Sequence, residues 1–518
     1  MAHTPLFGAL QRALAQTNVS FKPRALTRRS FLAMAAAIAA CRPQESNAQL
    51  PLPQNRGVAI VGGGAAGLTT AYRLSLAGRS ATLFEASTRF GGRMFTRREF
   101  NEDHQFCELG GELVDTNHAA IRNLARELGI GIQRLAPEGD EGEDLFNFNY
   151  RLYATRDILN ARGDGEFEAV ARRIARDQEA LLDRNGNWTR RARELDQMSL
   201  KAYLDPLRDH APDWIIALID LAYLGEYGIP TDQQSALNLV DMIGTDRNAG
   251  FQMFGESDEA FRIAGGSSTL TDALLARLGP TIAQRPRHVL NGVTKLPDGV
   301  RLSFESPNGL IETDFDVVVL ALPFTKLRTV SGINSLGLEQ IKLQAIRELG
   351  YGDNAKIMVG TKSRPWISDD RDFPTKSNGT FYSDRGMQVV WETSRAQPGE
   401  RGILTNFLAG GITDRNEAIR KMALGFQAIS PTIADSFDLS KLADMFWARH
   451  QYTLGSYASA KIGQYTTLLE QTATPAFDGR IQFAGEHTSS DFLGYMNGAV
   501  ESGERVASAL LAPGSVLR

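Results

Sequence analysis

Residues 58–74 read VAIVGGGAAGLTTAYRL, a short apolar run that meets three consecutive glycines and then a stretch with helical spacing. The four apolar residues Val58–Val61 are typical of a parallel strand that is covered on both faces. Gly67, Ala71 and Leu74 recur at helical spacing and predict a small-residue face for close packing. Glycines between two rigid elements indicate that something comes very close to the backbone there.

The glycines match a known spacing. Gly62, Gly64 and Gly67 fit G-x-G-x-x-G, with Ala66 inside the same step from turn to helix. In this pattern the first glycine allows a tight turn, the second lets a pyrophosphate approach the backbone, and the third lets the helix pack on the strand. These four residues are therefore predicted to bind a dinucleotide.

The residues after the helix support the same prediction. Gly78 is expected to end the helix, and Ala81–Phe84 is expected to form the next strand. Glu85 follows about 20 residues after the motif, where a carboxylate binds ribose hydroxyls and would repel a 2′-phosphate. The alternative, a purely structural glycine turn, would not explain strand, helix, second strand and acid in register.

A second glycine-rich segment distinguishes between dinucleotides. FEASTRFGGRMFT, residues 84–96, contains Arg89, two glycines and Arg93, which supply close backbone approach and positive charge for a phosphate. The pattern resembles the R-x-G-G-R motif of the flavin amine oxidase superfamily, and ELGGE (108–112) and His118 follow where that family shows them. The resemblance implies FAD, with Arg93, Gly111 and Glu112 among the residues that bind it.

The C-terminal part of the chain carries a further match to the same superfamily. Residues 479–511 read GRIQFAGEHTSSDFLGYMNGAVESGERVASALL, which predicts a strand, a turn and a long helix. The resemblance implies that Glu486 binds the flavin ribityl chain, that Thr488 also contacts the cofactor, and that the helix after Tyr495 points its N-terminus at the flavin. The strand HVLNGVTKL (288–296) implies an adenine contact at Val289.

The expected fold class is α/β. A discontinuous Rossmann-type FAD-binding domain is expected to alternate along the chain with an α+β substrate domain, helical in its first part and strand-rich in its second. The predicted ranges are 57–117, 261–345 and 442–513 for the FAD-binding domain, and 118–260 and 346–441 for the substrate domain.

The resemblance also implies three catalytic residues. Lys356, in YGDNAKIMV, resembles the lysine that the family holds near the flavin, often through water. Tyr457 and Tyr495 match tyrosines that flank the substrate amine in monoamine oxidases, where ring faces orient an amine. Ser456 stands where those enzymes have the cysteine joined to the flavin, so the FAD is expected to be noncovalent. Each of the three could instead have a structural role.

The substrate is predicted less directly. Many L-amino acid oxidases have an arginine after the glycine motif, whereas Leu113 follows Glu112 here. The segments GGELVD and VVWETSR nevertheless resemble a bacterial branch with amino-acid-oxidising enzymes. Glu112 is a candidate for binding a cationic side chain such as that of arginine or lysine, with a structural role as the alternative. Trp391, Gly494 and Tyr495 are the other substrate candidates.

The predicted activity is FAD-dependent oxidative deamination of L-amino acids, basic ones among them, to a 2-oxo acid and ammonia. The rivals are a monoamine or polyamine oxidase, a flavin desaturase and a non-catalytic flavoprotein. Oxygen and a quinone are alternative electron acceptors, and a homo-oligomer is one alternative for the assembly. The chain has 56 basic and 60 acidic residues, which disfavours a nucleic-acid partner. With seven His and two Cys, no metal site is expected.

The N-terminal 48 residues are predicted to be an export signal and linker. Arg28 and Arg29 precede the apolar run Phe31–Ala40, which is too short to span a bilayer but fits the core of a twin-arginine signal. Cys41 fits a lipid-anchoring site, and cleavage after Ala48 is the alternative. The expected location is the periplasm, or the outer side of the inner membrane as a lipoprotein.

Overall fold

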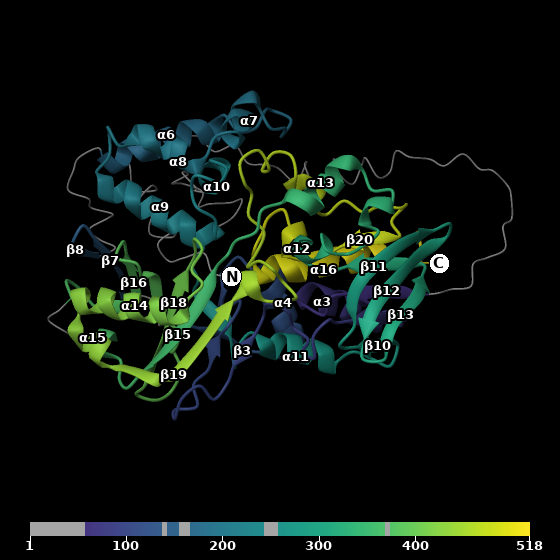
Figure 1. Ribbon diagram of the computed structural model, residues 1–518, viewed down its shortest axis with the longest axis horizontal. Coiled ribbons are helices and arrows are strands. Elements are labelled where there is room, and N and C mark those ends of the chain that lie inside the picture. The colour runs from purple at the N-terminus through teal and green to yellow at the C-terminus, as the bar shows by residue number, and fades with distance from the viewer. Residues whose placement is uncertain (1–56, 137–141, 155–165, 243–256, 368–372, 518) are drawn as a thin grey trace.

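The computed structural model describes residues 57–136, 142–154, 166–242, 257–367 and 373–517. The predicted export segment and Cys41 lie outside these residues. Figure 1 shows two parts side by side, a parallel-sheet domain built on a five-stranded sheet and a mixed-sheet domain built on a seven-stranded one. No helix within the described ranges is long and apolar enough to cross a membrane.

The parallel sheet contains the strand that was predicted at the glycine motif. Its order is β10 (Ile282–Arg285), β2 (Ala81–Phe84), β1 (Val58–Val61), β14 (Val317–Leu320) and β20 (Ile481–Phe483). β1 pairs in parallel with β2 on one side and β14 on the other, and all four of its residues are buried. Both faces of β1 are covered, which explains why its sequence is apolar throughout and does not alternate.

Two layers cover this sheet. One is helical and consists of α3 (Ala65–Leu76), α4 (Ala119–Glu127), α11 (Ser268–Ala276) and α16 (Met496–Leu511), whose apolar residues share one core. The other holds β11 (Val289–Leu296), β12 (Gly299–Ser306), β13 (Gly309–Phe315), α12 (Phe324–Leu327) and α13 (Gln340–Glu348). A Cβ on Gly503 would lie 2.6 Å from the Ala66 carbonyl oxygen, so glycine lets α16 contact α3 closely.

The mixed sheet has a different construction. Its order is β19 (Phe437–Phe446), β15 (Ala355–Thr361), β18 (Gly402–Leu408), β17 (Gln388–Glu392), β16 (Ser377–Ser383), β7 (Glu143–Phe148) and β8 (Arg151–Ala154). All neighbours are antiparallel except β16 and β7.

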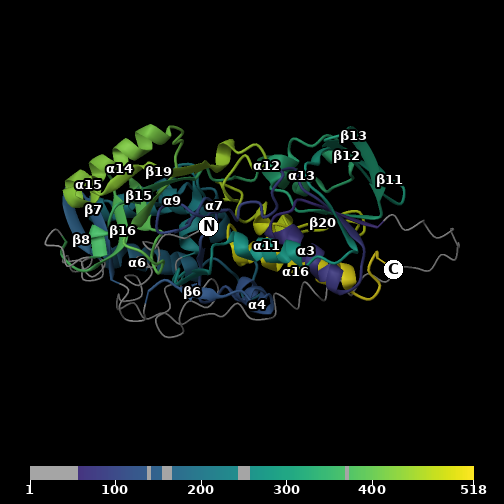
Figure 2. The ribbon, with the colours of Figure 1, turned by 90° about the horizontal axis from the view of Figure 1, so that it is seen from below.

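Helices cover both faces of the mixed sheet, as Figures 1 and 2 show. One face packs on α6 (Glu166–Glu179), α7 (Arg190–Asp196), α8 (Leu200–Leu204), α9 (Asp213–Tyr227) and α10 (Leu237–Val240). The other packs on α14 (Arg415–Ile429) and α15 (Pro431–Asp435). Lys356 and Trp391 lie on the first face, because strand pairing sets them opposite Phe407 and Thr405 of β18.

Short sheets complete the junction between the domains. β3 (Thr96–Arg97) pairs with β4 (Cys107–Glu108), and β9 (Phe261–Ile263) lies between β5 (Leu113–Val114) and β6 (Ile132–Arg134). β4 and β5 flank the glycine segment at residues 110–111.

Three elements depart from the expected domain boundaries. α4 begins at Ala119, inside the range assigned to the substrate domain, yet its apolar side packs in the core of the parallel-sheet domain. α13 extends past residue 345 to Glu348 and packs in the parallel-sheet domain. β19 continues to Phe446, past the expected boundary at 442, because it pairs along the edge of the mixed sheet.

Candidate active site

One large cavity connects the sequence motifs. It has a volume of about 900 Å³, within the usual range for a site that binds a small molecule or cofactor. All three segments of the parallel-sheet domain line it, and the lining includes Gly64, Ala66, Glu85, Arg93, Gly111, Val289, Glu486, Gly494 and Tyr495. Nine of the predicted site residues therefore meet at one surface.

The glycine turn at the start of this cavity has the geometry that its sequence predicts. Gly62 has a φ of +109°, and a Cβ there would lie 2.4 Å from the Ala321 carbonyl oxygen. A Cβ on Gly67 would lie 2.0 Å from the Gly62 carbonyl oxygen, so this glycine lets α3 pack on the turn. A Cβ on Gly64 would meet only Gly92, at 3.9 Å, which keeps the N-terminus of α3 open to the cavity.

Glu85 lies at the end of β2 and accepts hydrogen bonds from the turn around it. Its Oε2 accepts from the Gly63 amide at 2.8 Å, and its Oε1 accepts from the Ser87 amide at 2.8 Å. Burial nevertheless raises the pKa of this carboxyl above its ordinary value. The carboxylate is thus oriented by backbone while its side chain still lines the cavity.

The two arginines of the R-x-G-G-R segment act differently. Arg89 donates to carbonyl oxygens of its own loop, at Phe90 and Met94. Arg93 Nη1 donates to the Glu486 Oε1 at 2.8 Å and to the Ser456 carbonyl at 2.7 Å. The Glu486 Oε2 accepts from the Gly494 amide at 3.0 Å. Arg93 and Glu486 therefore join the first motif to the last.

Two other predicted cofactor residues differ in position. Val289 begins β11 and lines the cavity. Thr488 is buried beside it, where its hydroxyl donates to the Gly485 carbonyl at 2.9 Å and accepts from Arg505 at 2.9 Å. Thr488 thus fixes the turn that carries Glu486, and its hydroxyl bonds to protein groups.

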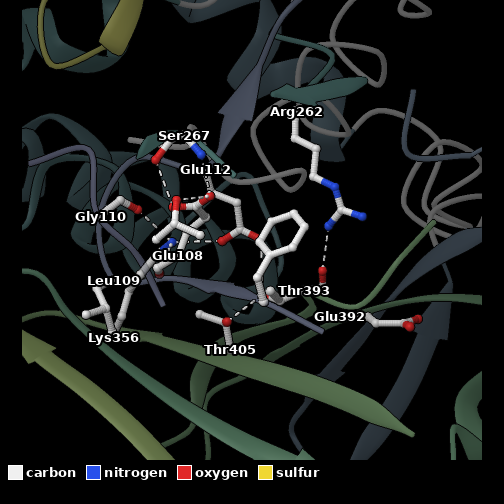
Figure 3. A network of polar contacts seen from close by, with 12 residues as sticks. Glu108, Leu109, Gly110, Glu112, Arg262, Ser267, Lys356, Glu392, Thr393 and Thr405 are labelled. Carbon is white, nitrogen blue, oxygen red and sulfur yellow. Dashed lines mark hydrogen bonds and ion pairs between the residues drawn. The ribbon is translucent and has the colours of Figure 1, made fainter. Parts of the chain in front are cut away.

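Lys356 extends from β15 into the junction between the domains, as Figure 3 shows. Its Nζ lies 2.8 Å from the Glu112 Oε2, 2.9 Å from the Gly110 carbonyl and 3.3 Å from the Glu108 carbonyl. The three N–H bonds of the ammonium therefore each have a protein acceptor. Lys356 holds the loop whose Gly111 lines the cavity.

Both oxygens of Glu112 have partners in the same network. The Oε1 accepts from the Thr393 hydroxyl at 3.0 Å, and that hydroxyl lies 2.6 Å from the hydroxyl of Thr405. Burial acts to raise the pKa of Glu112, but the Lys356 ammonium holds it below its ordinary value. Glu112 was considered for binding a substrate cation, and here its charge is balanced by Lys356.

The neighbouring carboxyl, Glu108, is buried and accepts its hydrogen bonds from neutral groups. It accepts from the Thr96 hydroxyl and from the amide and hydroxyl of Ser267. Burial raises the pKa of Glu108 to about 7, and Glu112 adds to the rise. Two buried carboxyls four residues apart thus have opposite pKa shifts, because only one is paired with an ammonium.

The two tyrosines lie on either side of Gly494. A Cβ on Gly494 would lie 3.3 Å from the Tyr457 ring, so glycine keeps the two turns in contact. The Tyr457 hydroxyl donates to the Gly225 carbonyl at 3.2 Å and to the Glu226 carbonyl. Tyr495 lines the cavity, and its ring packs edge-on against His118 with centroids 4.9 Å apart.

Trp391 and Arg262 complete the junction. The Lys356 ammonium lies 5.0 Å from the centre of the Trp391 ring, which is 1% exposed and belongs to the core under α9. Arg262, buried on β9, donates to the carbonyls of Thr393 and Arg395. Its guanidinium thereby ties β9 to the end of β17.

A family model, flavin-containing amine oxidoreductase, matches residues 65–511. The chain belongs to this family. Its members are flavin-dependent oxidoreductases that act on CH–NH₂ groups and use FAD. The expected fold class holds at that level, an α/β protein with a flavin-binding fold.

Similar proteins match this chain over most of its length. A probable flavin-containing monoamine oxidase A of Dictyostelium discoideum is 23% identical, and the match covers 88% of this chain and 97% of that protein. A putative L-amino-acid oxidase, YobN, of Bacillus subtilis (strain 168) is 25% identical, with 87% and 93% covered. The structure of putrescine oxidase bound to putrescine has a TM-score of 0.71 at 22% identity, with 89% and 100% covered, which shows a shared fold.

The cavity fits the FAD of the amine oxidoreductase family. At Gly62 and Gly92 a Cβ would contact backbone atoms, so only glycine leaves the backbone there open. The N-terminus of α3, which follows Gly64, suits a pyrophosphate. Glu85 offers carboxylate oxygens at one end, and the N-terminus of α16 reaches the wall at Tyr495 and Met496. The residues present therefore match the donors and the open space that this dinucleotide needs.

Sequence reasoning missed a group of buried acids near the tyrosines. Asp115 pairs with His118, with Oδ2 3.4 Å from Nε2, and accepts the Glu259 amide at 2.9 Å. Glu226 at the end of α9 and Glu259 before β9 are also buried. The spacing of Asp115 and His118 was a readable signal, whereas Glu226 and Glu259 lie in stretches that resemble ordinary helix and loop.

Proposed function

We propose that the protein oxidises L-amino acids, basic ones among them, to 2-oxo acids and ammonia with noncovalently bound FAD. The observation that supports this most is the single cavity that runs from the glycine turn and Glu85 to Gly494 and Tyr495. Its far end meets the loop held by Lys356 and the ring of Tyr457. In this proposal the dinucleotide site and the amine site are adjacent.

FAD, when bound, supplies the acceptor for the two electrons and the hydrogen removed from the carbon that bears the amine. The chain's own residues bind and orient. The rings of Tyr457 and Tyr495 present faces and edges that direct an amine nitrogen, and the buried surroundings exclude bulk water. The resulting imine reacts with one water to give the carbonyl compound and ammonia.

Lys356 is a positioning residue in this proposal. Its ammonium binds the carbonyl oxygens of Glu108 and Gly110 and the carboxylate of Glu112, which orders the wall at Gly111. Arg93 and Glu486 order the opposite wall in the same way. Both pairs fix backbone that faces the cavity, and fixed backbone is what a positioned amine requires.

The similarity to the putative L-amino-acid oxidase YobN of Bacillus subtilis (strain 168) supports an amino-acid substrate. A second candidate, a monoamine or polyamine oxidase, is favoured by one observation. The buried guanidinium of Arg262 already binds Thr393, Arg395 and Gln133, so this arginine is committed to the protein and does not offer itself to a substrate carboxylate.

Anaerobic mixing of the FAD-loaded protein with amines tests the proposal. L-arginine, L-lysine, L-leucine, putrescine and phenethylamine should be compared by the loss of flavin absorbance. We expect bleaching by L-amino acids, followed by recovery of colour when air or a quinone is admitted. Bleaching by putrescine or phenethylamine alone would favour the second candidate, and a flavin that no amine bleaches would refute both.

We further propose that the chain is exported through a twin-arginine route to the periplasm, with Cys41 as a site for a lipid anchor. Arg28, Arg29 and the apolar run after them support this proposal. Fractionation of cells that express the full chain, beside an Arg28→Lys/Arg29→Lys variant, tests it. The variant should accumulate in the cytoplasm, and equal distribution of both proteins would contradict export.

A further inference from the structure

Glu259 is a buried acid that lacks a hydrogen-bond partner among the described residues. It is 7% exposed, and neither of its carboxylate oxygens has a hydrogen-bond partner among the described residues. Glu112, a buried carboxylate in the same junction, is satisfied by Lys356 and Thr393. A buried charge with no partner is costly, so an unpaired carboxylate in a folded protein needs an explanation.

The surroundings of Glu259 are acidic. Burial raises its pKa well above the ordinary value, and Asp115, Glu226 and Asp144 raise it further. The charge of Arg395 acts in the other direction, and its Nε donates to the Glu392 carbonyl. Three acids and one arginine around an unpaired carboxylate make a place that favours an additional positive charge.

These acids adjoin the predicted amine site from two sides. On one side Asp115 contacts both the Glu259 amide and His118, and His118 packs on Tyr495. On the other side the Tyr457 hydroxyl donates to the Glu226 carbonyl, and burial, together with the charge of Glu226, raises the pKa of that tyrosine. Glu259 is therefore linked to Tyr495 through Asp115 and His118, and to Tyr457 through Glu226.

We propose that Glu259, with Asp115 and Glu226 beside it, binds a second cationic group of the amine substrate. An ammonium or guanidinium group supplies the donors that the carboxylate oxygens lack, and its charge balances the acids. The substrate class is then a basic amino acid, a diamine or a polyamine. The inference rests on the proposed amine oxidation and adds the site that selects the far end of the substrate.

Two matched pairs of substrates test the inference. L-lysine is compared with L-norleucine, and putrescine with n-butylamine, by anaerobic stopped-flow bleaching of the flavin, which gives a dissociation constant and a limiting rate separately. In at least one pair, the wild type should bind the compound with the second ammonium group about 10-fold or more tightly than its matched compound without that group. Glu259→Gln should abolish that preference, with the limiting rate unchanged within about twofold, because a buried ionic partner contributes to binding.

The control variants separate this role from a structural one. Glu259→Asp keeps the charge and should retain part of the preference, and Glu312→Gln removes a charge from the exposed strand β13 and should change nothing. Flavin absorbance per protein reports folding. If Glu259→Gln fails to bind FAD, Glu226→Gln is measured in its place with the same expectation.

The outcomes distinguish the inference from the proposed function. Equal binding of the compound with the second ammonium group by the wild type and Glu259→Gln, or a wild-type preference for the compound without that group in both pairs, overturns the inference while bleaching still supports amine oxidation. Absence of bleaching by every amine refutes the proposed function itself. Which pair carries the preference distinguishes an amino acid from a diamine.

Discussion

The buried carboxylates of this protein fall into two regions that differ in how they are satisfied. Along the glycine turn and the C-terminal motif, Glu85 accepts two backbone amides, and Glu486 accepts Arg93 and the Gly494 amide. Behind the tyrosines, Glu259 has no partner among the described residues. The two regions meet at the same junction of the domains.

This difference indicates in which region the buried carboxylates are satisfied by the protein itself, without a substrate. Paired carboxylates orient backbone and keep one arrangement, which suits a cofactor that stays bound. An unpaired carboxylate is satisfied only when a cation arrives, which suits a ligand that enters and leaves. Glu112 lies between the regions and belongs with the paired group, because Lys356 supplies its cation.

The largest effect is expected when Glu112 loses its ion pair with Lys356. Lys356→Met removes the ammonium and leaves the buried carboxylate of Glu112 without its ion pair, although the Thr393 hydroxyl still donates to it. We expect a loss of about 3–5 kcal/mol in the free energy of unfolding, together with slower turnover. Denaturant unfolding of the FAD-loaded protein measures the first effect.

A double variant provides the matched control. Lys356→Met with Glu112→Gln removes both charges, so most of the lost stability should return while turnover stays slow. If the double variant is as unstable as Lys356→Met, the ion pair is not the source of the stability and the comparison between the regions fails.

Two glycines test whether the paired region depends on backbone contact. Gly67→Ala places a methyl group 2.0 Å from the Gly62 carbonyl, so α3 must move, at a cost of about 1–3 kcal/mol or more. Gly64→Ala meets only Gly92, at 3.9 Å, and should fold normally. Because Gly64 lines the cavity, this variant should bind FAD less tightly, as equilibrium dialysis of the flavin would reveal.

The same pair gives opposite readouts. The midpoint temperature of thermal unfolding should fall for Gly67→Ala and stay unchanged for Gly64→Ala. The affinity for FAD should fall in both variants. A Gly64→Ala protein that retains full FAD affinity would argue against pyrophosphate binding at this turn.

Glu108 provides a test by pH, since its hydrogen bonds come from neutral groups and not from an ion pair. Burial raises its pKa to about 7 in the folded state, above the ordinary value of 4.5, so folding favours the protonated form. The stabilisation it contributes is complete below about pH 4.5 and is lost as pH rises through 7. Burial raises the pKa of Asp115 to about 7 as well, so its contribution to stability is also lost as pH rises.

The measurement compares unfolding free energies from pH 5 to 8. Stability of the wild type should fall across this range, and Glu108→Gln should flatten the fall by on the order of 1–3 kcal/mol. Identical slopes for the two proteins would mean that Glu108 stays ionised at pH 5.

The smallest expected effect is at Tyr457. Tyr457→Phe removes the hydroxyl that donates to Gly225 and Glu226 but keeps the ring. Stability should fall by about 0.5–1.5 kcal/mol, and kcat/KM should change by less than about threefold if the ring face orients the amine. Tyr457→Leu is the control, and its kcat/KM should fall much further.

The sequence predicted most of what local rules determine. The strand at Val58–Val61, the turn and α3 follow from apolar runs and glycine spacing, and each is present. The last motif predicted β20 and α16 in the same way. Resemblance then selected residues that line one cavity, although they are far apart in the chain.

Contacts across the chain could not be predicted from local patterns. The Lys356 and Glu112 pair joins residues 244 positions apart, and neither segment indicates that the other neutralises it. Glu259 lies in ESDEA, a run with the composition of a surface loop, and its burial depends on the packing of both domains. α4 was predicted in the substrate domain because the apolar face of a helix does not indicate which domain it packs against.

The pair formed by Arg93 and Glu486 has a consequence for biosynthesis. The two residues are 393 positions apart, and β20 adds to β14 only after it has left the ribosome. At about 5–20 residues per second, Arg93 waits roughly 20–80 seconds for its acid during translation. The nascent glycine turn therefore spends that interval without the C-terminal wall of its pocket, and capture of the vitamin-derived cofactor becomes one of the last events of synthesis.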